Sequence, residues 1–158
     1  MKRMILGSDR SGFPLKEAIK EFLKAEGYEV EDVGMHNMED FMPYYVVAPK
    51  VAERIRSGEY EKGILCCGTG AGMAIVANKF QGVYAVPVEG SYTARMASVV
   101  NQANVLTLGG WVIAPQQALE MVKLWLDTPF TEGFPEDRQK FLCNAFKEVQ
   151  EIEKKNMK

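Results

Sequence analysis

The residues with the clearest chemical potential are a cysteine and the glycine-rich segment that follows it. Cys67 precedes Gly68-Thr69-Gly70-Ala71-Gly72, which places three glycines within five positions. Glycine lets backbone N–H groups approach a ligand closely because no Cβ stands in the way. The N-terminus of a helix also favours negative charge, and a thiol that faces one is a candidate base or nucleophile. The segment therefore predicts an anion-binding loop beside a reactive thiol.

Two common nucleotide-binding motifs do not fit this loop, so a nucleotide-binding module is only a third alternative. The loop lacks the Gly-Lys-Ser/Thr ending of a P-loop, and the third glycine of a dinucleotide fingerprint would fall on Met73. Taken alone, Cys67 could also be a small buried core residue, as free cysteines usually are. A cysteine-protease site is disfavoured, because His36 is the only histidine and nothing pairs it with Cys67.

The elements that must position the loop alternate along the chain between short β-rich runs and helical patterns. We expect strands at 2–8, 28–33, 62–67, 82–88 and 105–108, and helices at 13–26, 43–57, 73–79, 91–101, 115–126 and 135–154. This alternation predicts a doubly wound, Rossmann-like α/β fold: a parallel five-stranded sheet with helices on both faces, plus the C-terminal helix. Ligands bind such sheets beyond the carboxyl ends of the strands, which is where the glycine loop falls.

Composition limits the classes of partner. The 158 residues suit a single domain spanning 1–158, and 19 basic against 21 acidic side chains give a net charge of −2. We therefore expect neither a nucleic acid nor a membrane as partner. The N-terminal apolar run at 4–6 is too short for a signal peptide or a membrane helix. Three cysteines, two of them adjacent, indicate a reducing, cytoplasmic compartment. One histidine and no Cys-x-x-Cys pair predict no metal site.

Segments on either side of the loop extend the pattern into that of a known family. Gly7 to Phe13 with Leu15-Lys16, Cys67 to Met73 with Ala77-Asn78-Lys79, and the segments 92–96 and 101–110 resemble motifs of type B ribose-5-phosphate isomerases and galactose-6-phosphate isomerases. The resemblance runs from about residue 3 to 128. It implies metal-independent isomerisation of a small sugar phosphate, without a cofactor. It also implies a homodimer or a dimer-based tetramer with the active site at the subunit interface.

The resemblance further implies a role for each site residue. Cys67 would be the base that moves a proton between C1 and C2 through a cis-enediolate, and Thr69 would assist proton transfer at the oxygens. Asp9 and Asn101 would bind sugar hydroxyls. The enediolate oxyanion would be held by backbone N–H groups of Gly68, Gly70, Ala71 and Gly72. This agrees with the chemistry, since aldose–ketose exchange needs a base beside a carbon acid and donors where negative charge develops.

The sequence departs from the family where the family binds phosphate. Arg10 stands where the family has a histidine, Trp111 where it often has an arginine, and only Arg138 remains of a C-terminal clamp. We expect Arg10, together with Arg138 of the partner subunit, to bind phosphate. The alternatives are an ion pair of Arg10 with Asp9 and an ordinary surface position for Arg138. Asp9 could instead cap the helix that begins near Phe13.

The ring-opening histidine of the family is replaced by Val100, which cannot transfer a proton. This substitution leads to the hypothesis that the small phosphorylated sugar is short or already open-chain, such as a tetrose or tetrulose phosphate, or is a ketose that opens spontaneously. Trp111 and Phe134 leave a sugar without phosphate as an alternative. A catalytically inactive sugar-phosphate-binding relative is the second function. The apolar face of 135–154 could pack on the partner subunit or on its own chain.

Overall fold

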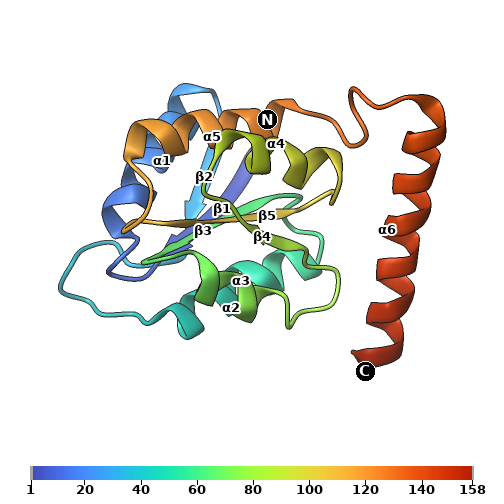
Figure 1. The fold of residues 1–158 in the computed structure, drawn as a ribbon. Helices are drawn as coiled ribbons and strands as arrows, with labels where there is room; N and C mark the ends of the chain where they lie inside the picture. The colour runs from blue at the N-terminus through green and yellow to red at the C-terminus, as the bar shows by residue number, and fades with distance from the viewer. Residues whose placement is uncertain (1, 158) are drawn as a thin grey trace.

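A computed structural model describes residues 2–157, in which strands and helices alternate in the predicted order (Figure 1). The strands are β1 (Arg3–Ser8), β2 (Glu29–Asp32), β3 (Gly63–Cys67), β4 (Ala85–Pro87) and β5 (Val105–Gly109). The helices are α1 (Phe13–Ala25), α2 (Tyr44–Arg56), α3 (Ala71–Ala77), α4 (Ser91–Val99), α5 (Pro115–Asp127) and α6 (Glu136–Asn156). The predicted doubly wound α/β fold is confirmed.

The sheet is parallel throughout, with the strand order β2-β1-β3-β5-β4. In Figure 1, α1, α4 and α5 cover one face of the sheet, and α2 and α3 cover the other. The three central strands β1, β3 and β5 are buried almost along their whole length, as expected for strands covered on both faces. In the sheet, β2 pairs with one edge of β1, and the next strand in sequence, β3, pairs with the other edge of β1. The loops that leave β1 and β3 therefore flank the switch point at which such sheets bind ligands.

Two hydrophobic cores fill the space between the sheet and its helices. Because side chains alternate along a strand, Cys66 faces the core beneath α1, α4 and α5, whereas Cys67 faces the core beneath α2 and α3. Trp125 of α5 is fully buried in the first core and donates its indole N–H to the carbonyl of Ala103. The two adjacent thiols thus lie in different layers.

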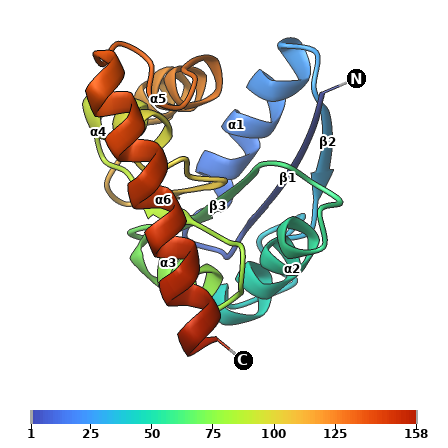
Figure 2. The same cartoon turned by 90° about the vertical axis from the view of Figure 1, so that its right-hand side faces the viewer.

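The C-terminal helix α6 lies beside the sheet, outside the two helix layers (Figure 1), and it faces the viewer in Figure 2. Its Phe146 ring packs against Tyr84, with ring centroids 5.0 Å apart, and Glu153 accepts hydrogen bonds from the Tyr84 hydroxyl and the Gly82 N–H. Packing on its own chain is therefore observed for one face of α6. Another face remains exposed, including Phe141 and Ile152. No helix within residues 2–157 is long and apolar enough to cross a membrane.

Candidate active site

The glycine loop begins at the carboxyl end of β3, where Cys67 is the last strand residue. Gly70 is the N-cap of α3 and has a positive φ of 84°, a left-handed conformation that side chains disfavour. This turn directs the Gly70 N–H at the Cys67 sulfur, with 3.1 Å between nitrogen and Sγ. A donor at this position stabilises negative charge on the sulfur. The pairing of a thiol with a loop N–H that the sequence predicts is therefore present.

The two adjacent cysteines differ in their suitability for proton transfer. Cys66 is completely buried, and burial raises the pKa of its thiol far above the ordinary value. Cys67 is 5% exposed and lies where the strand opens into the loop. It also belongs to the second core, so the structure gives it a packing role as well. Within residues 2–157, no three His, Cys, Asp or Glu side chains form a group that could hold a metal ion.

Further hydrogen bonds fix the shape of the loop. The Thr107 hydroxyl on β5 donates to the Gly70 carbonyl at 2.8 Å, and the hydroxyl oxygen of Thr69 accepts the Ala71 N–H at 3.3 Å. Gly109 backs the loop so closely that a Cβ there would lie 2.7 Å from the Cα of Thr69. The Thr69 side chain itself is exposed. The loop is thus braced from β5, while Thr69 faces the solvent two residues from Cys67.

Two aromatic rings lie against the ends of the loop. The Trp111 ring covers Gly68, where an added Cβ would lie 2.6 Å from a ring carbon, and the Tyr44 ring covers Gly72 at 3.0 Å. The Trp111 N–H donates to the Gly68 carbonyl at 2.9 Å, yet its side chain is 74% exposed. Sequence reasoning noted Trp111 but missed Tyr44. Tyr44 could have been found from its place at the start of the helix that follows β2, because in a parallel α/β sheet such a helix begins near the carboxyl ends of the strands, where the glycine loop lies.

Asp9 lies on the neighbouring loop, which leaves β1. Its carboxylate accepts the Gly12 N–H at 3.0 Å, and its own N–H donates to the Cys66 carbonyl at 3.3 Å. Burial raises the pKa of Asp9, and hydrogen bonds from the N–H groups of Gly12 and Ser11 partly offset the rise. The N-cap of α1 is Gly12, so Asp9 does not cap the helix as one alternative supposed. Its carboxylate instead binds that cap residue, beside the end of β3.

Arg10 is exposed on the same loop. Within the described residues its guanidinium stacks on the Phe41 ring, 5.0 Å from the ring centroid, and forms no ion pair with Asp9. The ion-pair alternative for Arg10 is therefore wrong. The stacked guanidinium keeps its N–H groups free for an anion beside the sheet end.

Asn101 and Arg138 lie elsewhere. Both line a groove of about 350 Å³ between α6 and the edge of the sheet, together with Val100. The Arg138 guanidinium lies 4.7 Å from the Phe141 ring centroid. Asn101 precedes β5, at the amino end of the sheet, whereas Cys67 ends β3 at the carboxyl end.

The predicted site residues therefore form two groups. The first gathers at the carboxyl ends of β1 and β3 and consists of Asp9, Arg10, Cys67, Gly68, Thr69, Gly70, Ala71 and Gly72. The second, Asn101 and Arg138, lies in the groove beside α6. The five residues of β3 alone span about 13 Å. One chain does not bring both groups to the same small sugar.

Comparison with known proteins identifies the family of the chain. The family model described as Ribose/Galactose Isomerase matches residues 4–142. The chain is 49% identical to the 4-deoxy-4-sulfo-D-erythrose isomerase of Clostridium sp. (strain MSTE9), over 96% of this chain and 95% of the relative. It is 38% identical to the D-erythrulose-4-phosphate isomerase of Pectobacterium atrosepticum, over 84% of this chain and 88% of the relative.

A solved structure extends the likeness to three dimensions. The chain superimposes on Clostridium thermocellum ribose-5-phosphate isomerase B with a TM-score of 0.88 and 41% identity, over 97% of this chain and 98% of that one. The family resemblance seen in the sequence is confirmed. The chain therefore belongs to the ribose/galactose isomerase family and is an isomerase.

Proposed function

We propose that the chain interconverts the aldose and ketose forms of a four-carbon sugar with an anionic group at C4. The observation that carries the proposal is the Gly70 N–H, 3.1 Å from the sulfur of Cys67 on a braced loop. In this arrangement the Gly70 N–H donates to the sulfur of the proposed base, and the remaining N–H groups of the loop are the donors proposed for the charge that develops during enolisation. Two relatives are named for four-carbon substrates, a sulfo-erythrose and an erythrulose phosphate.

Val100 supports the short substrate on chemical grounds. An aldotetrose closes a five-membered ring only through its C4 hydroxyl, and that oxygen is blocked by a 4-phosphate and missing in a 4-deoxy-4-sulfo sugar. Such a substrate has no ring to open. An enzyme for it needs no acid–base group for ring opening, which agrees with a valine at this position.

The proposed reaction uses two proton transfers at carbon. The Cys67 thiolate removes the proton from C2 of the aldose, and the C–H electron pair forms the C1–C2 double bond of a cis-enediolate while negative charge develops on O1. Backbone N–H groups of Gly68–Gly72 hold that charge. The thiol then returns its proton to C1, and the C2 oxygen becomes the carbonyl of the ketose. Thr69 carries the proton that must move from O2 to O1.

The two candidate terminal groups differ in charge. A sulfonate carries one negative charge, whereas a phosphate monoester carries about 1.5 to 2 at neutral pH. Arg10 and Arg138 are the cations proposed to meet it, and Trp111 contributes an apolar ring. Two arginines can pair with either anion, so we rank a 4-sulfonate ahead of a 4-phosphate on sequence identity alone. The higher identity to the sulfo-erythrose isomerase supports this order.

The second group of residues requires a second copy of the chain. Asn101 and Arg138 complete the site only if a partner subunit places its groove against the glycine loop, which supports a homodimer with shared sites. The exposed face of α6 is the surface proposed to contact the partner. The cytoplasmic location inferred from the free cysteines stays a prediction.

A substrate panel tests the proposal. Isomerisation of 4-deoxy-4-sulfo-erythrose, erythrose 4-phosphate, ribose 5-phosphate and unmodified erythrose would be followed by NMR. We expect kcat/KM to be highest for the 4-sulfonate and second for the 4-phosphate. Faster turnover of ribose 5-phosphate than of both four-carbon anions would overturn the substrate assignment. Thermal stabilisation by these sugars without turnover would instead make the chain a binding protein.

A further inference from the structure

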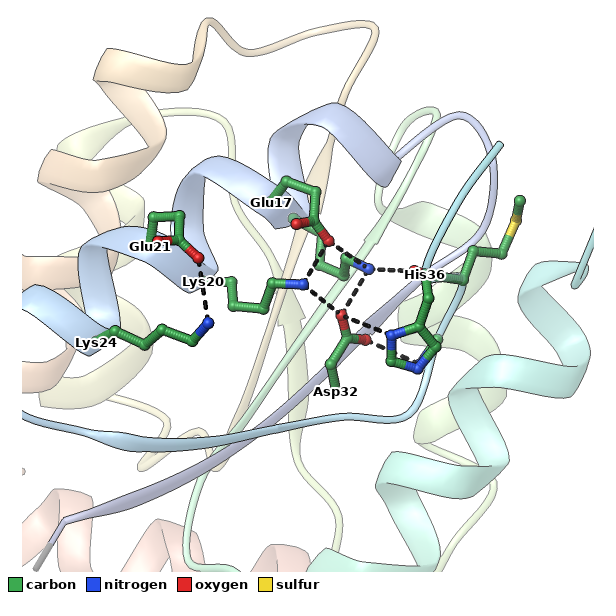
Figure 3. Close-up of polar contacts among 9 residues, drawn as sticks. Glu17, Lys20, Glu21, Lys24, Asp32 and His36 are labelled. Atoms are coloured by element: carbon green, nitrogen blue, oxygen red, sulfur yellow. Dashed lines mark hydrogen bonds and ion pairs between the residues drawn. The ribbon is translucent and has the colours of Figure 1, made fainter. Parts of the chain in front are cut away.

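A partly buried cluster of charges between α1 and β2 takes no part in the proposed proton transfers. The Lys16 side chain is 0% exposed, and its ammonium lies 2.7 Å from Asp32 and 3.0 Å from Glu17. It also donates a hydrogen bond to the carbonyl of Met35. Figure 3 shows the surrounding side chains, with Glu17 and Lys20 on α1 facing Asp32. Burying a lysine is costly unless its charge is paired and its hydrogen bonds are made, so the function of this contact needs explaining.

The cluster holds the segment after β2 in place. While Lys16 binds the carbonyl of Met35, the carboxylate of Asp32 accepts the N–H of Gly34 at 3.1 Å. The imidazole of His36 lies 4.0 Å from the same carboxylate and is exposed (Figure 3). The two members of one ion pair therefore hold two consecutive residues: Asp32 binds the N–H of Gly34, and Lys16 binds the carbonyl of Met35.

This segment in turn supports the residue before Asp9. The Met35 N–H donates to the Ser8 carbonyl at 3.0 Å. Gly34 packs so tightly on Ser8 that a Cβ added to Gly34 would lie 2.3 Å from the backbone nitrogen of Ser8. The Ser8 hydroxyl is buried and has no hydrogen-bond partner among the described residues. Backbone contacts, not the side chain, therefore hold Ser8 and set the start of the Asp9 loop.

We propose that Lys16 is a positioning residue for substrate binding, which acts through Met35 and Ser8 on the Asp9 carboxylate. The inference rests on the proposed function in one respect, namely that Asp9 binds a sugar hydroxyl. Lys20 provides a matched control. It lies 2.6 Å from Glu17 and 3.1 Å from Asp32, so it pairs with the same two carboxylates. The carbonyl of Met35 is bound by Lys16 instead.

The kinetic test compares Lys16→Met with Lys20→Met. A shift of about 1 Å in a substrate-positioning group can lower a rate by up to about a hundredfold, so we expect Lys16→Met to lower kcat/KM by about tenfold or more. Lys20→Met should change it less than about twofold. In an Asp9→Ala background the Lys16→Met effect should nearly vanish, because the group it positions is gone. An equal loss with and without Asp9, or an equal loss in Lys20→Met, would overturn the inference.

A double variant separates positioning from stability. Lys16→Met alone leaves Asp32 buried without its main partner and lowers the melting temperature. Lys16→Met with Asp32→Asn removes both charges, and the asparagine oxygen can still accept the Gly34 N–H. We expect the melting temperature to recover in the double variant while kcat/KM stays low. Recovery of both together would show a purely structural role.

Hydrogen exchange gives a readout that does not depend on catalysis. The Gly12 amide, which donates to Asp9, should exchange faster in the double variant than in the wild type, and at the wild-type rate in Lys20→Met. Unchanged exchange at Gly12 in the double variant would contradict the inference even if the wild type shows no isomerase activity. Absence of that activity alone would count only against the proposed function.

Discussion

Two inactive variants should restore each other's activity when their subunits are mixed. The variants are Cys67→Ala, which removes the proposed base, and Asn101→Ala, which removes a proposed sugar ligand from the opposite end of the sheet. Within one chain the two positions are separated by at least the length of β3, about 13 Å. A site that uses both must therefore take Cys67 from one subunit and Asn101 from the other.

The expected recovery follows from the symmetry of a dimer. Random reassociation of equal amounts gives about half mixed dimers. In each mixed dimer, one site combines both substitutions and the other combines both native residues. One of two sites in half of the dimers is then intact, so the mixture should show about a quarter of the wild-type activity.

The assay uses two affinity tags to isolate mixed dimers after co-expression, and the isolated mixed dimers should show about half of the wild-type activity, because one of their two sites is intact. A mixture of Cys67→Ala with Thr69→Ala is the matched control, because both residues lie on one loop and no mixed dimer regains a complete site. A mixed dimer of Cys67→Ala and Asn101→Ala that is no more active than the two variants alone would refute the shared site. A chain that is monomeric at assay concentration would refute it as well.

Three further predictions concern the loops at the carboxyl ends. Gly70→Ala should lower the free energy of unfolding by about 1–2 kcal/mol, because alanine must adopt a left-handed φ of 84°. The melting temperature should then fall by roughly 2–8 °C, and an unchanged melting temperature would show that alanine is not strained at this position. Burial raises the pKa of Asp9 above 3.8 in the folded state, so the protonated carboxyl favours folding. This stabilising contribution is fully present below pH 3.8 and is lost as the pH rises through the raised pKa. Asp9→Asn should therefore be more stable than the wild type to urea at neutral pH, with the difference shrinking toward 3.8; a constant difference would argue against the raised pKa. In a Cys143→Ser background, iodoacetamide should label Cys67, inactivate the enzyme and spare the buried Cys66, as measured from the masses of peptide fragments. Faster labelling of Cys66 than of Cys67 would contradict the assignment of Cys67 as the reactive thiol.

The order of the elements could be predicted because each local pattern agrees with the global fold. The strand at 62–67 carries alternate residues into opposite cores, so the different surroundings of Cys66 and Cys67 follow from a period of two. The loop could likewise be predicted from local sequence, because three glycines follow Cys67 within five positions. Only glycine readily adopts the left-handed turn at Gly70.

The boundaries that differ depend on contacts distant in the sequence. β4 spans Ala85–Pro87 instead of 82–88, because Gly82 has a φ of 80° and the Asn104 side chain binds the backbone of Gly82 and Tyr84. α6 continues to Asn156, two residues past the predicted end. No local propensity contains this information.

The burial of Lys16 and the exact position of the Tyr44 ring could not be predicted from the sequence for a related reason. A lysine on an amphipathic helix is normally exposed, and nothing in the pattern reveals that Lys16 of α1 is buried and pairs with Asp32 of β2. The position of the Tyr44 ring over Gly72 depends on the path of the segment between β2 and α2, which follows from tertiary packing.

The central claim is that the Cys67 sulfur removes the C2 proton of a sugar held beside the Gly70 N–H. The most direct measurement is exchange of that proton with deuterium from the solvent, followed by NMR in the wild type and in Cys67→Ala. The account predicts exchange in the wild type and none above background in the variant, with sugar affinity nearly unchanged. Exchange at the wild-type rate in Cys67→Ala would show that another group is the base and would contradict the account.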